Sequence, residues 1–210
     1  MTLQSDIVAD SEGNSWYERN RTKLPVRDDP VLALLARNSV PTVDILEIGC
    51  ADGWRLSELR ERYKARCVGV DLSFSAIISG RERDPKLSLH YGNANRMQFL
   101  ADEAFDLVIF GFCMYLIDRG SLFSVVAEGD RVLRDRGHLV IYDFLCGPSP
   151  HSVPYKHDRR LRTFKMDHPK LFLANPAYRL VDFLHSVREQ TGAWLMRKDV
   201  EAGWPMEQEE

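Results

Sequence analysis

The sequence predicts an α/β protein built around a doubly wound, mostly parallel sheet. Short apolar segments alternate with amphipathic helix patterns between residues 43 and 144. The apolar segments, such as 43–48 and 105–112, are hydrophobic along most of their length, which is typical of strands buried on both faces. The last third loses this alternation, and its segments 181–185 and 193–200 fit a closing antiparallel hairpin.

The individual elements follow from capping and periodicity. Residues 1–11 show no periodicity, and we expect them to fray. Asp28 or Asp29 can cap a helix that begins at Pro30, and Ser73 can cap a later one. Right-handed crossovers then make a doubly wound sheet the economical topology. The expected strands are 43–48, 67–70, 87–91, 105–112 and 139–144, and the other expected helices are 15–24, 54–64, 76–83 and one from Leu122 that ends near Gly137.

Composition narrows the class of protein. The chain has 210 residues, 44% hydrophobic and 28% charged, with a net charge of −3, so neither nucleic acid nor an anionic membrane is favoured as a partner. Its apolar runs are too short to span a membrane, and no secretion signal is evident, so we expect a cytoplasmic protein. The four cysteines form no CxxC pair, which favours reduced thiols over disulfides or a metal site.

The strongest motif is a glycine-rich turn after the first predicted strand. In the segment DILEIGCADG (44–53), Gly49 and Gly53 allow a sharp turn and a close approach of the backbone to a ligand. The spacing differs from the GxGxxG turn that seats a pyrophosphate, and the acids Glu47 and Asp52 would repel a phosphate. We therefore expect a ligand without phosphate that is cationic near this turn. The alternative is a turn that serves only tight packing.

Two further motifs follow the second and third predicted strands. Asp71 ends the second strand, 22 residues after Gly49, where an acid can accept hydrogen bonds from both hydroxyls of a ribose. Its alternative role is helix capping. After the third strand, Asn93 could bind the amino group of an adenine and the Ala94 backbone its ring edge, while Leu72 would cover one face of the ring.

These three segments resemble the class I S-adenosylmethionine-dependent methyltransferases over residues 43–145. The resemblance implies a seven-stranded Rossmann-like sheet with an antiparallel final strand, and methyl transfer from S-adenosylmethionine to an O, N, C or S atom. Segments 105–109 and 131–138 match further motifs of the family. Two positions depart from it: Ala51 replaces the commoner middle glycine, and Asn93 stands where the family usually has Asp.

The resemblance also implies one domain over residues 1–210. It consists of an N-terminal helical lid (1–40), a cofactor-binding core (41–146), and a substrate loop with a closing hairpin (147–210). The lid would close over the cofactor with residues of the segment SWYERNR (15–21); alternatively, Trp16 and Tyr17 only anchor a helix on the sheet. This segment, like 164–178, is similar to methyltransferases of bacterial sugar-modifying pathways. The expected cofactor residues are Trp16, Tyr17, Arg19, Asn20, Glu47, Gly49, Cys50, Ala51, Asp52, Gly53, Asp71, Leu72, Asn93, Ala94 and Phe110.

The methyl acceptor is less well defined. A hydroxyl acceptor needs a group that removes its proton, and the candidates near the ends of the fourth and fifth strands are Tyr115, Asp143, His151 and His157. Alternatively, Tyr115 lines the pocket, Asp143 caps a loop or binds Arg159, and the two histidines lie at the surface.

Residues 156–165 contain five basic residues and one acidic residue, which indicates either a solvated loop or a site for a small anionic acceptor. In the second case Arg159, Arg160 and Arg162 would bind the acceptor.

Three other functions were weighed against O-methylation of a small molecule. A nucleotide-dependent oxidoreductase would need a pyrophosphate loop, which the sequence lacks. A non-catalytic cofactor-binding protein would be expected to have a damaged pocket, whereas Glu47, Gly49, Gly53 and Asp71 are all present. An N-methyltransferase of RNA or protein would carry an Asp/Asn-Pro-Pro-aromatic motif after the fourth strand, and FGFC (110–113) stands there instead. The sequence predicts no metal site and does not indicate an oligomeric state.

Overall fold

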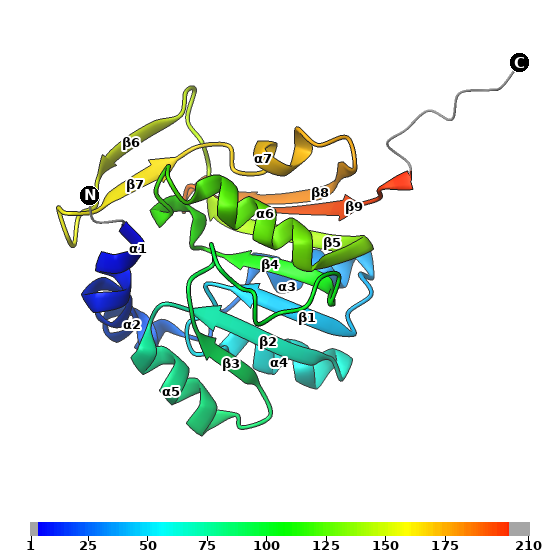
Figure 1. Cartoon of the computed structure of the whole chain (residues 1–210), viewed down its shortest axis with the longest axis horizontal. Helices are drawn as coiled ribbons and strands as arrows, with labels where there is room; N and C mark the ends of the chain where they lie inside the picture. Colours follow the sequence, from blue (N-terminus) through cyan, green and yellow to red (C-terminus); the bar gives the residue numbers. More distant parts are fainter. Residues whose placement is uncertain (1–3, 202–210) are drawn as a thin grey trace, which may run out of the picture.

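One seven-stranded sheet runs through the centre of the computed structural model, which describes residues 4–201 (Figure 1). Its strand order is β3-β2-β1-β4-β5-β9-β8. Strands β1 to β5 pair in parallel, and β9 runs antiparallel to both β5 and β8. The predicted fold class is therefore confirmed, with the final strand reversed. The bounds are β1 Asp44–Ile48, β2 Arg66–Asp71, β3 Ser88–Tyr91, β4 Phe105–Gly111, β5 Leu133–Phe144, β8 Tyr178–Ser186 and β9 Thr191–Lys198.

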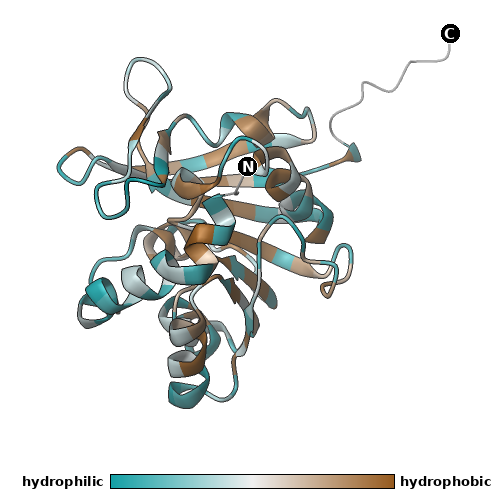
Figure 2. Ribbon diagram, turned by 60° about the vertical axis from the view of Figure 1, so that its left-hand side comes forward, coloured by the Kyte–Doolittle hydropathy of each residue, from teal (hydrophilic) through white to brown (hydrophobic). Residues whose placement is uncertain are grey.

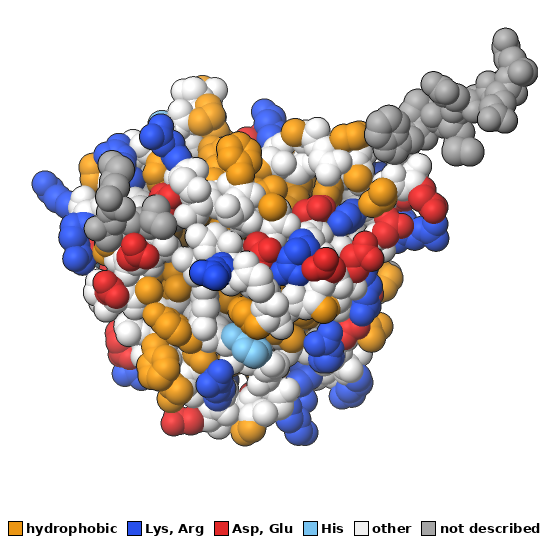
Figure 3. Space-filling model, in the orientation of Figure 1, with side chains coloured by type: hydrophobic (Ala, Val, Ile, Leu, Met, Phe, Trp, Pro, Cys, Tyr) orange, Lys and Arg blue, Asp and Glu red, His pale blue; other side chains and the backbone are white. Residues whose placement is uncertain are grey.

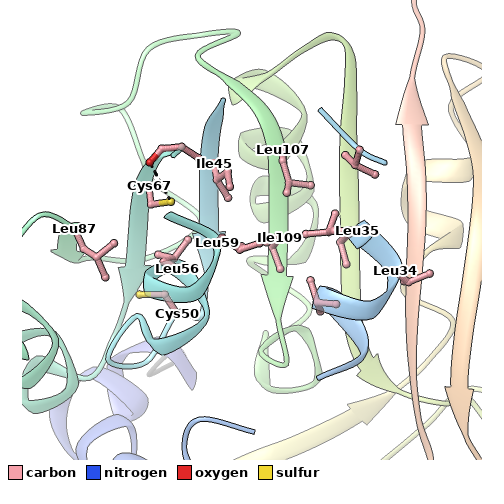
Figure 4. Close-up of a cluster of buried hydrophobic side chains, with 14 of the residues drawn as sticks. Leu34, Leu35, Ile45, Cys50, Leu56, Leu59, Cys67, Leu87, Leu107 and Ile109 are labelled. Carbon is pink, nitrogen blue, oxygen red and sulfur yellow. Dashed lines mark hydrogen bonds between the residues drawn. The ribbon is translucent and has the colours of Figure 1, made fainter. Parts of the chain in front are cut away.

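Helices cover both faces of the sheet. Alternate residues of each central strand point to opposite faces. Ile45 and Ile109 lie in one buried cluster with residues of α3, α4 and α5 (Figure 4). Leu46 and Phe110 lie in a second cluster with residues of α6 and α7. Hydropathy follows this layering, with hydrophobic strands inside and hydrophilic outer helix faces (Figure 2). The helices are α1 Gln4–Ile7, η1 Val8–Glu12, α2 Gly13–Asn20, η2 Arg21–Lys23, α3 Pro30–Asn38, α4 Trp54–Tyr63, α5 Phe74–Arg83, η3 Met114–Leu116, α6 Leu122–Val132 and α7 Lys170–Leu173.

Two predicted helix caps are present. The side chain of Asp29 accepts a hydrogen bond of 3.0 Å from the Leu32 amide, and Pro30 occupies the first turn of α3. The hydroxyl of Ser73 accepts a hydrogen bond from the Ala76 amide at the start of α5. Each cap satisfies an amide that the helix itself leaves unpaired.

The N-terminal residues differ from the prediction, because residues 4–12 are helical rather than frayed. Tertiary contacts explain the difference: the Gln4 side-chain amide donates to the Leu116 carbonyl at 2.9 Å, and its oxygen accepts from the Arg162 amide at 2.6 Å. Such contacts to distant residues leave no periodicity in the local sequence. Residues 1–3 lie outside the described part of the chain.

The end of α6 also differs from the prediction. The helix ends at Val132 and leads directly into β5, although the sequence indicated a helix to about Gly137. The guanidinium of Arg134 pairs with Asp106 at 2.8 Å and with Asp44 at 3.0 Å. These ion pairs hold a highly charged segment in the sheet, where charge alone would suggest a helix end or a loop.

The segment after β5 contains a hairpin that the sequence did not indicate. Strands β6 (His151–Pro154) and β7 (Arg162–Lys165) form a separate two-stranded sheet beside α1 (Figure 1). Strands β8 and β9 form the predicted closing hairpin. The expected C-terminal region also includes residues 202–210, which lie outside the described residues.

Two further sequence-based expectations concern the cysteines and the membrane. All four cysteines are free, and Cys50 and Cys67 are buried. Within residues 4–201, none of the helices has the length and hydrophobicity needed to cross a membrane.

Candidate functional site

A cavity opens at the carboxyl ends of the central parallel strands, the place where open α/β sheets bind ligands. Its floor comes from three neighbouring strands: Ile48 and Gly49 end β1, Val70 and Asp71 end β2, and Gly111 ends β4. The N-terminal helices face these strand ends (Figure 1). The topology thus brings together residues that are far apart in the sequence.

The glycine-rich turn requires its glycines. Gly49 has a φ of +75° and Gly53 a φ of +71°, a region that favours glycine. A Cβ atom on Gly49 would lie only 2.6 Å from Cβ of Cys113. Ala51 also adopts a positive φ, +49°, at the position where the resembling family more often has glycine. The turn therefore places Gly49 against the cavity without a side chain in the way.

Asp71 lies at the edge of this turn with its carboxylate fixed by the backbone. Its Oδ2 accepts from the Ala51 amide at 2.8 Å, and its Oδ1 accepts from the Ser73 amide at 2.7 Å. Burial raises the pKa of Asp71, although the amides of Ser73 and Ala51 act to lower it. Since Ser73 supplies the α5 cap, Asp71 is not needed as the capping residue, and it lines the cavity.

The residues expected around an adenine are also in place. Leu72, Asn93 and Ala94 all line the cavity, together with Gly92. The Asn93 side-chain oxygen accepts from the Asn95 amide at 3.2 Å, which fixes the orientation of the side chain. Together, these four residues form the end of the cavity beside β2 and β3.

The two acids of the glycine-rich segment, Glu47 and Asp52, do not lie in the cavity as predicted. Glu47 is buried outside the cavity lining and forms an ion pair with Arg55, which also binds Asp29 at 2.9 Å. Burial raises the pKa of Glu47, against the opposing effect of Arg55. Asp52 is likewise outside the lining and is paired with Arg83. The electrostatic argument from these two acids therefore needs correction, because neither lines the cavity and each is paired with an arginine.

The N-terminal helices form one wall of the cavity. Residues 4–20 run continuously through α1, η1 and α2, and we call them the N-terminal wall. The middle portion is a π-helix, a form often found at functional sites. A Cβ atom on Gly13 would lie 2.9 Å from the Leu72 carbonyl oxygen, so the wall contacts the core closely. Its cavity-lining residues are Ser5, Val8, Glu12, Gly13 and Trp16.

Other residues expected to bind the cofactor lie outside the lining. The Tyr17 hydroxyl donates to Ser79 at 2.9 Å, and the Asn20 amide donates to the Trp16 carbonyl. Both contacts stabilise the N-terminal wall. The rest are Arg19, which pairs with Glu12; Cys50, Ala51 and Gly53, which shape the turn; and Phe110, which packs against Phe172 on the other face of the sheet.

Aromatic side chains form the cavity end beside β4 and β5. Phe112 and Tyr115 line the cavity, with ring centroids 5.3 Å apart, and Phe144 packs behind them. Phe112 has a φ of +61°, an uncommon conformation for a bulky residue and one that occurs at functional sites. The Tyr115 hydroxyl has no hydrogen-bond partner among the described residues. It is the one proposed catalytic residue that reaches the cavity.

Asp143 is fully buried behind this cluster and does not line the cavity. It accepts from the Tyr115 amide at 3.1 Å and from the Phe144 amide at 2.7 Å. Burial raises the pKa of Asp143 to about 7. Asp143 thus binds backbone amides of the loop after β4 and of its own strand, which agrees with the alternative that it caps a loop. It does not pair with Arg159.

The proposed histidine and arginine residues lie on or near the β6–β7 hairpin, outside the cavity. His151 and His157 are exposed. Arg160 pairs with Asp158 at 2.6 Å. Basic side chains gather at this end of the molecule (Figure 3). Arg162 binds the Ser152 carbonyl, and none of Arg159, Arg160 and Arg162 lines the cavity.

Sequence reasoning missed Glu12 and Tyr155. Glu12 is buried in the N-terminal wall, and the Tyr155 hydroxyl donates to it at 2.9 Å from the loop between β6 and β7. Residues 5, 8, 12 and 16 can share one helix face, but Ser5 and Glu12 are polar, so no apolar periodicity marked this face in the sequence. No local signal joins Glu12 to Tyr155, because 143 residues separate them.

Comparison with known proteins agrees with this geometry. Residues 45–137 match a family model described as a methyltransferase domain. This part of the chain is therefore similar to methyltransferase domains, in agreement with the resemblance of its motifs to the class I S-adenosylmethionine-dependent methyltransferases. Among curated proteins, a ubiquinone/menaquinone biosynthesis C-methyltransferase of Dinoroseobacter shibae is 33% identical over 98 residues, which are 44% of this chain and 38% of that protein. The match thus spans well under half of that relative.

Solved structures show the same fold over most of the chain. The 1,6-didemethyltoxoflavin N1-methyltransferase of Burkholderia thailandensis, crystallised with its substrate and S-adenosylhomocysteine, has a TM-score of 0.72 at 15% identity and covers 93% of this chain and 87% of its own. The N-methyltransferase NodS of Bradyrhizobium japonicum, in complex with S-adenosylhomocysteine, has a TM-score of 0.61 at 22% identity, with coverages of 87% and 97%. At these identities the likeness concerns the fold.

Proposed function

We propose that this protein transfers the methyl group of S-adenosylmethionine to a small-molecule acceptor. The observation that carries the proposal is one cavity in which Gly49, Asp71 and Asn93 meet from three separate parts of the chain. When bound, the cofactor supplies a methyl group already activated by its sulfonium. The protein has to hold the acceptor in line with that group, which is mainly an effect of proximity and orientation.

The charges around the cavity support this cofactor over a dinucleotide. None of its lining residues in the described part of the chain is a lysine or an arginine, while the acids Asp71 and Asp118 line it. A pyrophosphate would meet no compensating cation there, whereas the ammonium and the sulfonium of S-adenosylmethionine would lie near carboxylates. Asp71 would bind the ribose hydroxyls, and Leu72 and Asn93 the adenine.

Small-molecule O-methylation is the preferred reaction within this proposal. The sequence after β4 reads FGFC (110–113) and lacks the motif expected for methyl transfer to amino groups of RNA or protein. The aromatic end of the cavity, with Phe112 and Tyr115, suits a compact or flat acceptor. Among the catalytic candidates, Tyr115 is the one placed to contact it. A sugar-like hydroxyl compound remains the preferred acceptor class.

An anionic acceptor remains part of the proposal, with its acidic group outside the cavity. Arg159, Arg160 and Arg162 lie on the hairpin and can contact only the outer part of a bound acceptor. Replacing all three by alanine should raise the KM of an anionic acceptor and leave the Kd of S-adenosylhomocysteine unchanged. An unchanged KM would remove the anionic group from the proposal.

Isothermal titration calorimetry tests the cofactor directly. S-adenosylhomocysteine should bind the purified protein, and NAD should give no heat. Asp71→Ala should weaken S-adenosylhomocysteine binding about tenfold or more, because it removes a charged hydrogen-bond acceptor for the ribose. Asp102→Ala, at an exposed position far from the cavity lining, is the matched control and should bind normally. If NAD binds and S-adenosylhomocysteine does not, the cofactor is a dinucleotide and the proposed function is wrong.

A further inference from the structure

The N-terminal wall holds a buried carboxylate, Glu12, at the cavity. Its side chain is only 4% exposed, and Glu12 is among the residues that line the cavity. Arg19 forms an ion pair with Oε1, and the Tyr155 hydroxyl donates to the same oxygen at 2.9 Å. These two contacts fix the carboxylate from one side, so its orientation does not depend on a ligand.

The other carboxylate oxygen, Oε2, has no hydrogen-bond partner among residues 4–201. Unlike the Ser5 hydroxyl, this oxygen is not enclosed by the protein, so a ligand in the cavity can reach it. A hydrogen bond to a charged group is stronger than one between neutral groups. A bound molecule that supplies an N–H or O–H donor at this point therefore gains affinity that other molecules do not.

The surroundings of Glu12 define the rest of the acceptor. The Tyr115 hydroxyl and the buried Ser5 hydroxyl belong to the same cavity, and neither has a partner among the described residues. Trp16 and Phe112 add apolar surface. Since no lysine or arginine lines this cavity in the described chain, an anionic group beside Glu12 would meet a carboxylate and no free cation.

We propose that Glu12 is a specificity-determining residue of the acceptor site. It binds an N–H or O–H donor of the acceptor through Oε2, and it excludes acceptors that carry a negative charge at that point. The part of the acceptor that lies inside the cavity therefore carries a neutral or cationic donor group beside Glu12. This inference rests on the proposed methyl transfer, since it assigns the second substrate of the same cavity.

Three probes of similar size and different charge test the inference. Phenol, benzylamine and benzoate are titrated into the protein saturated with S-adenosylhomocysteine, and binding is followed by NMR chemical-shift changes. Benzylamine and phenol should bind the wild-type protein at least about tenfold more tightly than benzoate. Equal binding of the three probes, preferential binding of benzoate, or no binding of either donor would overturn the inference.

A variant that removes the charge of Glu12 tests whether this residue causes the preference for benzylamine over benzoate. Glu12→Gln should abolish the discrimination between benzylamine and benzoate, while the Kd of S-adenosylhomocysteine changes less than about twofold. The matched control is Glu18→Gln, an exposed glutamate in the same N-terminal wall that pairs with Arg21 as Glu12 pairs with Arg19. It should leave the probe preference intact. A preference that survives in Glu12→Gln would overturn the assignment.

A second variant separates the effect of the Glu12 charge from the effect of the shape of the N-terminal wall. Tyr155→Phe removes the hydroxyl contact to Oε1 and keeps the carboxylate, so the preference for benzylamine over benzoate should persist. Loss of the preference in Tyr155→Phe, with normal S-adenosylhomocysteine binding, would mean that the shape of the wall determines selectivity, and it would overturn the role of Glu12. If S-adenosylhomocysteine fails to bind the wild-type protein, the proposed function itself fails, which is a distinct outcome.

Discussion

Arg55 illustrates how a single residue can bind two buried acids. It contacts Glu47 and Asp29 at once, and all three side chains are almost fully buried. Arg55→Met would leave two carboxylates without their cation, and breaking a buried pair in this way costs about 3–5 kcal/mol. Urea denaturation at neutral pH measures the loss in the free energy of unfolding.

The control for Arg55 is Arg62→Met on the same helix. Arg62 pairs with Glu58 at the surface, where ion pairs contribute about 0–1 kcal/mol. A similar loss in both variants would show that the buried cluster is not special.

His168 is buried, and neither ring nitrogen has a hydrogen-bond partner among the described residues. Burial lowers its pKa from 6.5 to about 4, although Asp167 opposes the shift. Its contribution to stability is therefore fully present above pH 6.5 and is lost as the pH falls toward 4, because only the unfolded chain takes up the proton. We expect this residue to lower the free energy of unfolding by about 2 kcal/mol at about pH 5.

His168→Phe should remove this part of the acid sensitivity, and His151→Phe, at an exposed position, should not. Denaturation of the three proteins at about pH 7 and about pH 5 makes the comparison. An equal loss of stability in all three would assign the acid sensitivity to other groups.

Sequence reasoning worked best for site residues whose geometry is local. Gly49 and Asp71 follow strands in recognisable motifs, and both line the cavity. It failed for Glu47, because the partner that takes up its charge, Arg55, could be identified only from the packed structure. Glu12 was missed because a contact that holds its carboxylate comes from Tyr155, which is 143 residues away in the sequence.

At the scale of elements, the contact between the N-terminal wall and the core depends on a glycine. A methyl group at Gly13 would lie 2.9 Å from the Leu72 carbonyl, so Gly13→Ala must displace the helix or the loop after β2. We expect a loss of about tenfold or more in S-adenosylhomocysteine affinity, measured by calorimetry. Ser15→Ala, an exposed position on the same helix, is the control and should bind normally.

The order of the elements could be predicted from the sequence, and their ends less well. Strand β4 was expected almost to the residue, because its apolar run is continuous. The boundary between α6 and β5 was misplaced, since the charged residues around Arg134 are paired with Asp44 and Asp106 on neighbouring strands. The β6–β7 hairpin was not expected, because its strands lack a buried face with alternating hydrophobicity.

At the scale of the whole molecule, cofactor binding should stabilise the fold. The cavity joins strand ends, the N-terminal wall and the loop after β4, so a ligand bound there contacts parts that unfold together. S-adenosylhomocysteine at about 100 times its Kd should raise the free energy of unfolding by about 2.7 kcal/mol. Asp71→Ala at the same concentration should show a much smaller gain. Thermal or urea denaturation with and without the ligand measures both, and an equal gain in the two proteins would contradict a site at Asp71.

The N-terminal wall has a kinetic consequence. The same helical segment contacts Leu72, at the adenosine end, through Gly13 and reaches the aromatic end through Glu12 and Tyr155. A single outward swing of this segment would therefore uncover both substrates at once. In the proposed reaction, release of S-adenosylhomocysteine and entry of the next acceptor would then use the same opening.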